Sequence, residues 1–199
     1  MYLTPAQNVI VAAFVTADPA LSTVTPDQYG ADTIQQALNK VSAVDHFVYK
    51  TDTPALDLFD QITWTNFTPN DLPPVAAVPS APTAAETYAL TLWKARALQC
   101  QGKQFNLQTM LVGRSTLNTA KTNIRAGLQD CLTAIPSGSG GVNRSAGWVA
   151  VQTTLYRKAT VLEKILAAGT GTAASPATMA VEGAINLDEV MTAMGWTYA

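Results

Sequence analysis

The chain has 199 residues, a length that suits one domain or one domain with a substantial appendage. Its net charge of −2 argues against nonspecific nucleic-acid binding as its main role, because such binding depends on clustered cations that neutralise phosphates. Only 13% of the residues are charged, against roughly 25% in an average soluble domain. Part of the surface is therefore either covered by a partner, most simply another copy of the chain, or rich in Ala and Thr.

Neither membrane insertion nor secretion is indicated. No apolar run approaches the ~20 residues that a spanning helix needs. The apolar stretch Val9–Ala17 has no Lys or Arg before it, since the first cation is Lys40, so a signal peptide is not expected. Cys100 and Cys131 lie in helical patterns and are expected to be buried free thiols, which suits a reducing cytoplasm.

Residues 1–67 are interpreted as an N-terminal helical section. Threonine can cap a helix, and proline at the first helical position lacks only an N–H that would be unpaired. Three such pairs predict helix starts, at Thr4-Pro5, Thr25-Pro26 and Thr53-Pro54. Between the last two, residues 45–51 alternate and are β-branched or aromatic, which predicts a short strand.

Residues 68–82 hold five prolines in 15 positions. Because proline removes a donor and restricts φ, no helix or central strand is expected there. We predict an extended Pro-rich crossover, which could lie along a neighbouring molecule.

Residues 83–168 are predicted to be a helical core of at least three helices. The first begins with the capping-box pair Thr83 and Glu86. The second is predicted to begin at Ser115 or Thr116, and the third to run without interruption through residues 144–168 and stop at Gly169. The apolar stripe expected for the first helix consists of Tyr88, Leu92, Ala95, Leu98 and Phe105.

Residues 169–199 are interpreted as a C-terminal docking arm. An open spacer precedes a predicted strand at 178–183, and Asn186 with Glu189 predicts a last helix of about two turns. A helix that short does not persist alone in water, so it must dock on another molecule or fold back onto its own bundle. We expect the former, through these residues of the arm: Met179, Val181, Glu182, Leu187, Val190, Met191, Met194 and Trp196.

No catalytic, cofactor or metal site is predicted. His46 is the only histidine, the two cysteines form no C-x-x-C pair, and the glycine-rich stretches lack phosphate-loop endings. Asp57 and Asp60 are three residues apart on one helix without an evident partner. A solvated face is the simplest interpretation of that pair, and we expect the chain not to be an enzyme.

Both ends of the chain resemble small virion-associated proteins encoded in tailed-bacteriophage head and neck gene clusters. The similar stretches are "LTPAQ", "ADPAL" and "ADTIQQALN" near the N-terminus, then "NIRAGLQDCL", then "YRKATVLEKILAAGTGTAASPATMAVEGAINLDEVM". The residues that carry the resemblance are Asn123, Arg125, Gly127, Arg157, Ala159, Glu163, Lys164, Gly169, Gly171, Pro176, Glu182, Gly183 and Asp188.

The resemblance implies a mainly α fold, a helical bundle with a short β segment and an extended C-terminal arm. It also implies a head-to-tail adaptor in the virion neck, assembled in the host cytoplasm. Such a protein forms a homo-oligomeric ring of about a dozen copies that binds the portal and tail proteins. Ten of the 12 cations lie from Lys94 onward and could line a passage for DNA, but pairing within the chain explains the asymmetry equally well.

Two other functions stay open at this point. One is a different phage structural protein, such as a capsid-decorating or tail-completion protein. The other is a small-molecule-binding or hydrolytic domain that uses His46, Asp57 and Asp60.

Overall fold

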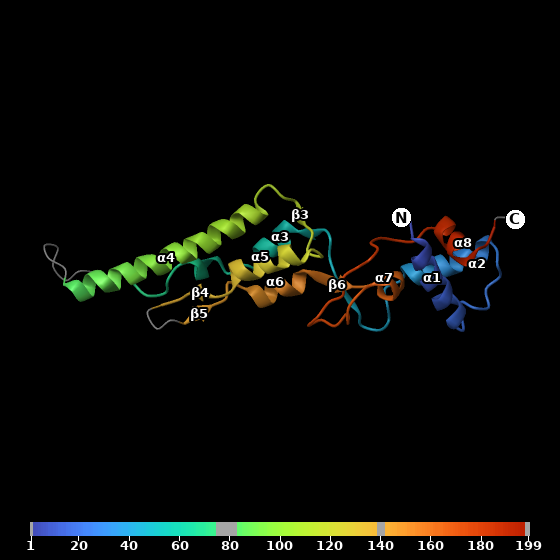
Figure 1. Ribbon diagram of the computed structural model, residues 1–199, viewed down its shortest axis with the longest axis horizontal. Coiled ribbons are helices and arrows are strands. Elements are labelled where there is room, and N and C mark those ends of the chain that lie inside the picture. Colours follow the sequence, from blue (N-terminus) through green and yellow to red (C-terminus); the bar gives the residue numbers. More distant parts are fainter. Residues whose placement is uncertain (1, 75–82, 139–141, 198–199) are drawn as a thin grey trace. The chain divides into compact units, whose positions relative to one another are not determined.

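Helices dominate the computed structural model, which describes residues 2–74, 83–138 and 142–197 (Figure 1). Strands are short and, within these ranges, pair only in twos: β1 with β6, β2 with β3, and β4 with β5. The expected mainly α fold with a short β segment is therefore confirmed.

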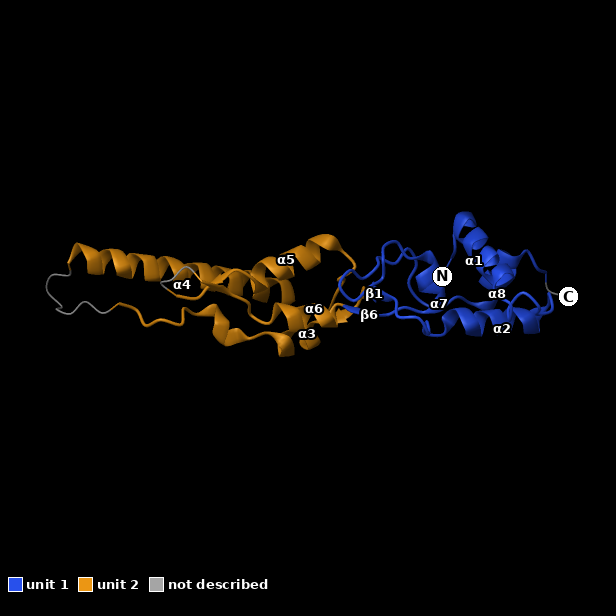
Figure 2. Ribbon diagram, turned by 90° about the horizontal axis from the view of Figure 1, so that it is seen from below, with its two compact units in different colours: residues 1–49, 156–199 blue, residues 50–155 orange. Residues whose placement is uncertain are grey.

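The described residues form two compact units, coloured separately in Figure 2. Unit 1 combines residues 1–49 with 156–199, and unit 2 consists of residues 50–155. The predicted division into four consecutive sections, with boundaries after residues 67, 82 and 168, does not coincide with these units. Both ends of the chain contribute to one core, and local sequence patterns do not report packing between segments so far apart.

Unit 1 is built from four helices and one pair of strands. Its core contains Ile34, Leu38 and Leu162, all fully buried, and draws side chains from every one of the four helices. The elements are α1 (Pro5–Ala17), α2 (Gln28–Asn39), β1 (Phe47–Tyr49), β6 (Tyr156–Lys158), α7 (Val161–Leu166) and α8 (Leu187–Met194).

The first two helices of unit 1 begin with side-chain caps. Thr4 caps α1 in a capping box with Gln7, and Pro5 is its first residue, as predicted. Helix α2 begins later than the predicted Thr25-Pro26 start, because Asp27 is the cap and accepts a 2.8 Å hydrogen bond from the Gly30 N–H. That bond to the backbone lowers the pKa of Asp27, as expected for a carboxylate that accepts from a helix start.

The single helix predicted for residues 144–168 is wrong. It divides into α6 (Trp148–Thr154), β6 and α7. Three residues form a strand because β6 pairs antiparallel with β1, so that Val48 lies opposite Arg157. Thr160 then starts α7 in a capping box with Glu163. That T-x-x-E spacing is visible in the sequence, but the helical apolar periodicity runs across the strand and conceals the break.

Glu163 also forms the most buried ion pair of unit 1. Its side chain is only 1% exposed, and both carboxylate oxygens accept 2.7 Å hydrogen bonds from Arg157. Burial by itself raises the pKa of this carboxyl group, but the bonds from Arg157 and from the Thr160 N–H outweigh burial and leave the pKa below its ordinary value. The pair therefore ties β6 to α7.

Replacing the carboxylate should destabilise unit 1. We expect Glu163→Gln to lower the free energy of unfolding near pH 7 by about 2 kcal/mol, because the half-buried Arg157 guanidinium loses its charged acceptor at a buried position. Since the folded-state pKa is lowered, the wild-type stabilisation is present above the ordinary pKa of 4.5 and is lost as the pH falls through the folded-state value. Chemical denaturation between pH 3 and 7 measures this: the difference between the two proteins should shrink on acidification. A constant difference would contradict it.

The C-terminal segment packs onto its own unit. Asn39 on α2 holds Ile185 by two 2.9 Å hydrogen bonds, one to its carbonyl and one from its N–H, and Gln35 donates to the same carbonyl. Beyond Ile185, α8 lies against α1 and α2 (Figure 1). The strand predicted at 178–183 is absent, and only isolated bridges form at Ala177 and Thr178. Of the two outcomes expected for the last helix, the structure shows that it folds back onto its own unit.

Ile185→Ala tests this packing. Ile185 is fully buried in the unit 1 core, so we expect a loss of about 2–5 kcal/mol in the free energy of unfolding. Glu182→Ala, at an exposed position of the same segment, serves as the control and should change stability by less than about 0.5 kcal/mol. Thermal and urea denaturation give both values. Equal stabilities for the two variants would indicate that the segment is not docked on unit 1.

Unit 2 surrounds one long helix. Helix α4 contacts α5, β4 and η1. The elements are β2 (Thr53–Pro54), α3 (Ala55–Gln61), η1 (Trp64–Phe67, a 3-10 helix), α4 (Ala84–Leu111), β3 (Thr116–Leu117), α5 (Thr122–Leu132), β4 (Ile135–Pro136), β5 (Asn143–Arg144) and α6.

Two predicted helix starts in unit 2 are strand residues instead. Thr53-Pro54 and Thr116-Leu117 pair with each other as β2 and β3, so α3 begins at Ala55 and α5 at Thr122. Thr53 and Thr119, both buried, share a 2.9 Å hydrogen bond between their hydroxyl groups beside this pair. The Thr83 start of α4 is correct, with the predicted capping box to Glu86.

The Pro-rich crossover is described only in part. Residues 68–74 contain neither helix nor strand, as predicted. Residues 75–82 lie outside the described residues, and so do residues 139–141 of one glycine-rich stretch.

Candidate interaction surfaces

The predicted docking residues of the C-terminal segment mostly face their own unit. Val190 and Met191 are buried in the unit 1 core. The others, apart from exposed Glu182, are half-buried and pack against buried clusters of unit 1: Met179, Val181, Leu187, Met194 and Trp196. In this conformation Val190 and Met191 cannot contact a partner. Contact between the half-buried side chains and a partner stays a prediction.

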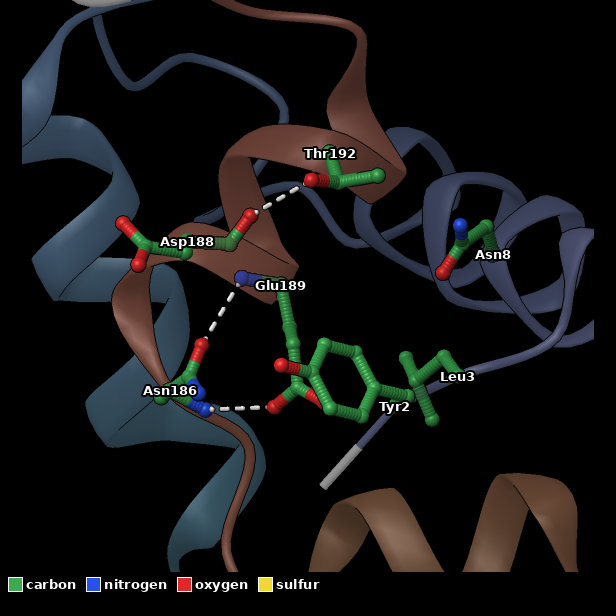
Figure 3. Close-up of a pocket in the computed structure, with 7 residues that line it drawn as sticks. All are labelled: Tyr2, Leu3, Asn8, Asn186, Asp188, Glu189 and Thr192. Atoms are coloured by element: carbon green, nitrogen blue, oxygen red, sulfur yellow. Dashed lines mark hydrogen bonds between the residues drawn. The ribbon is translucent and has the colours of Figure 1, made fainter.

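A small polar hollow lies beside the start of α8 (Figure 3). It measures about 150 Å³, and Asn186, Glu189 and Asn8 are among its lining residues. Asn186 accepts from the Glu189 N–H at 2.9 Å, and the Asn186 N–H donates to the Glu189 carboxylate at 3.0 Å. Because these polar atoms close a capping box, the hollow is accounted for by the helix start.

The residues considered for hydrolytic chemistry belong to separate units. Asp57 and Asp60 are exposed on α3 of unit 2, whereas His46 is part of unit 1. The His46 ring lies so close to Gly171 that a Cβ there would come within 2.1 Å of it, and Gly171 has a φ of +67°. Burial, and then the nearby Lys164, lowers the pKa of His46. A neutral ring packed against backbone is a structural role.

No cluster of three or more metal-ligating side chains occurs among the described residues. Cys100 and Cys131 are buried free thiols, as predicted. Burial raises the pKa of both thiols, which keeps them protonated. Cys100 donates to the Pro136 carbonyl at 3.3 Å and so joins α4 to β4.

One face of α4 packs against the rest of unit 2. Cys100, Leu107 and Leu111 are its buried side chains. Polar anchors flank them: Arg96 forms a 2.6 Å ion pair with Asp71. Lys103 pairs with Asp130 on α5. These contacts fix the rotation of α4 about its own axis and therefore decide which side chains point away.

The opposite face carries eight exposed, uncharged residues, which we call the α4 seam. Their spacing alternates strictly between three and four residues, the period of a coiled-coil contact stripe. Its four largest side chains are 66–70% exposed. The α4 seam consists of Tyr88, Thr91, Ala95, Leu98, Gly102, Phe105, Thr109 and Val112.

The apolar stripe predicted for the helical core is thus exposed. Tyr88, Leu98 and Phe105 belong to that predicted stripe, but the helix instead buries three residues of the opposite face. Helical periodicity identifies which residues share a face, but it does not identify what covers that face. The alternating spacing of the seam is the signal that distinguishes it, together with its lack of charge.

Two substitutions on α4 test which face is internal. Leu107→Ala should lower the free energy of unfolding by about 2–5 kcal/mol, because Leu107 is fully buried. Leu98→Ala, a matched change at a position 69% exposed, should cost less than about 1 kcal/mol. Urea denaturation at low protein concentration, where association does not contribute, measures both. A larger effect at Leu98 than at Leu107 would reverse the orientation of α4.

No protein-family model, curated protein or solved structure matches this chain. Among the described residues, no helix combines the length and the apolar character that crossing a membrane requires. Functional inference therefore depends on the surfaces described above and on the resemblance to phage neck proteins.

Proposed function

We propose that this chain is a structural, non-enzymatic protein of a tailed-phage particle, a head-to-tail adaptor whose ring joins the portal at the capsid vertex to the tail. The α4 seam is the observation that carries the proposal. Monomeric proteins rarely leave a long, aligned apolar face open to water, and such faces mark contacts with other proteins.

The other surfaces of the described chain support a structural role. The buried carboxylates Glu163 and Glu189 belong to capping boxes at helix starts, Glu163 is also ion-paired with Arg157, and the lone histidine packs against backbone. Most of the remaining exposed apolar side chains, such as Tyr29 and Val149, do not form an aligned stripe. A protein whose main surface feature is an uncharged helical face is suited to assembly.

The packing of α8 changes how a ring would be held together. A free C-terminal clamp is not required, because Val190 and Met191 stabilise their own unit. We propose that contacts with portal and tail proteins use exposed surfaces of the folded units. Exposed Glu182 stays available, whereas the buried residues of α8 would have to leave their core first.

Localisation in the particle tests the proposed function. We expect a chain that carries a small C-terminal tag to appear in purified virions at about a dozen copies, located at the neck by electron microscopy with a tag-specific label. Labelled capsid faces would instead favour a decorating protein, and labelled tail tips a tail-completion protein. Particles that lack the chain while infected cells contain it would contradict the proposal.

A further inference from the structure

We propose that the α4 seam pairs with the α4 seam of a second copy of this chain, with the two helices antiparallel. The inference goes beyond the proposed adaptor ring, because a two-fold contact closes on itself and a ring needs contacts elsewhere. It depends on α4 alone and stands or falls separately from a location in the phage neck.

The rows of the seam are complementary in size. One row holds Thr91, Leu98, Phe105 and Val112, and the other holds Tyr88, Ala95, Gly102 and Thr109. In an antiparallel pair, residues of one row meet residues of the other row across the contact. Centring the pair between Leu98 and Gly102 produces four kinds of layer, each present twice by symmetry: Leu98 with Gly102, Phe105 with Ala95, Thr91 with Thr109, and Val112 with Tyr88. Leu98 and Phe105, the two largest side chains of the first row, thus meet Gly102 and Ala95, the two smallest residues of the second row.

The surface of the seam has room for this arrangement. A Cβ placed on Gly102 would have no atom within 4 Å apart from its chain neighbours and the nearby backbone of α4 itself, so the centre of the seam is open. A shallow hollow of about 430 Å³, lined by Phe105, Gln108, Thr109 and Val112, lies at the C-terminal end. The Tyr88 ring of the second copy falls in the layer of Val112, beside this hollow. Small residues at the centre and a hollow at the end allow the helices to approach closely.

The helix dipoles favour the antiparallel direction. Among the positions that flank the seam, Lys94 is the only charged residue, beside Gln101 and Gln108 in the same row. In a parallel pair in register, Lys94 would face Gln99 of the second copy. The antiparallel pair places each Lys94 near Gln108 of the second copy, and it also opposes the two helix dipoles.

The area is sufficient for a stable pair. Helix α4 has 28 residues, which corresponds to ~42 Å at 1.5 Å per residue. Tyr88 and Phe105 are each about two-thirds exposed, which amounts to on the order of 250 Å² for the two rings. With Leu92, Leu98 and Val112 added, each copy contributes roughly 500 Å², so the pair reaches the ~1,000 Å² expected of a specific interface.

Gly102 provides the sharpest test. Gly102→Ala and Gly102→Glu both replace a helical glycine with a better helix former at an open position, so neither should weaken the fold of one chain. Only the glutamate places a charge in the central apolar layer. We expect the wild type and Gly102→Ala to dimerise in analytical ultracentrifugation, and Gly102→Glu to raise the dissociation constant at least ~100-fold. Val149→Glu, at an exposed site on α6 outside the seam, should leave dimerisation unchanged.

Directed crosslinking tests the direction of the pair. Cys100 and Cys131 are buried, so an introduced cysteine is the reactive one. Chains with Thr91→Cys, mixed with chains with Thr109→Cys and oxidised, should form a disulfide between the two kinds of chain. Disulfides only between like chains would overturn the antiparallel arrangement. The pairing would be overturned by a wild type that stays monomeric at all concentrations, or by a Gly102→Glu variant that dimerises equally well. The occupant of the seam would then be a helix of another protein. If the chain dimerises but is absent from virions, the adaptor function is rejected and the antiparallel pairing is retained.

Discussion

The packing of the C-terminal segment against the N-terminal helices is the constraint on which the architecture depends. Ile185 is held by Asn39 and Gln35, and α8 completes a core that α1 and α2 alone leave open. Because the two ends of the chain share one core, the chain must leave unit 1 after residue 49 and return to it at residue 156. The pairing of β1 with β6 lies where the chain does so, and unit 2 forms within the excursion.

Polar side chains in unit 1 mark where helices and strands begin and end. Glu163 caps α7 and, at the same time, neutralises Arg157 on β6, so one carboxylate determines where a strand ends and a helix begins. A capping box also starts α8 at Asn186. These residues belong to the stretch that resembles phage neck proteins, and their contacts give a structural reason for these residue types at these positions.

Helix α4 distributes its side chains differently from the other long helices. Its buried contacts are few, with Cys100, Leu107 and Leu111 inside and ion pairs at the margins. Tyr88, Leu98 and Phe105 occupy the outer face. An isolated helix gains nothing from exposing Phe105 and Leu98 to water, so the free energy that such a face can contribute is realised only on contact with another surface. This arrangement favours assembly over a compact single-chain function.

The sequence by itself determined the mainly helical fold and several helix starts, because caps such as Thr4, Thr83 and Asn186 act through hydrogen bonds three residues away. It also determined that the α4 seam lies on one face, since helical spacing is local. Only the tertiary structure decided that this face points outward, that residues 156–158 leave a helical pattern to pair with residues 47–49, and that the C-terminal segment folds back. These outcomes depend on contacts between segments more than 100 residues apart in the chain, or on burial against another element, and no local pattern encodes either.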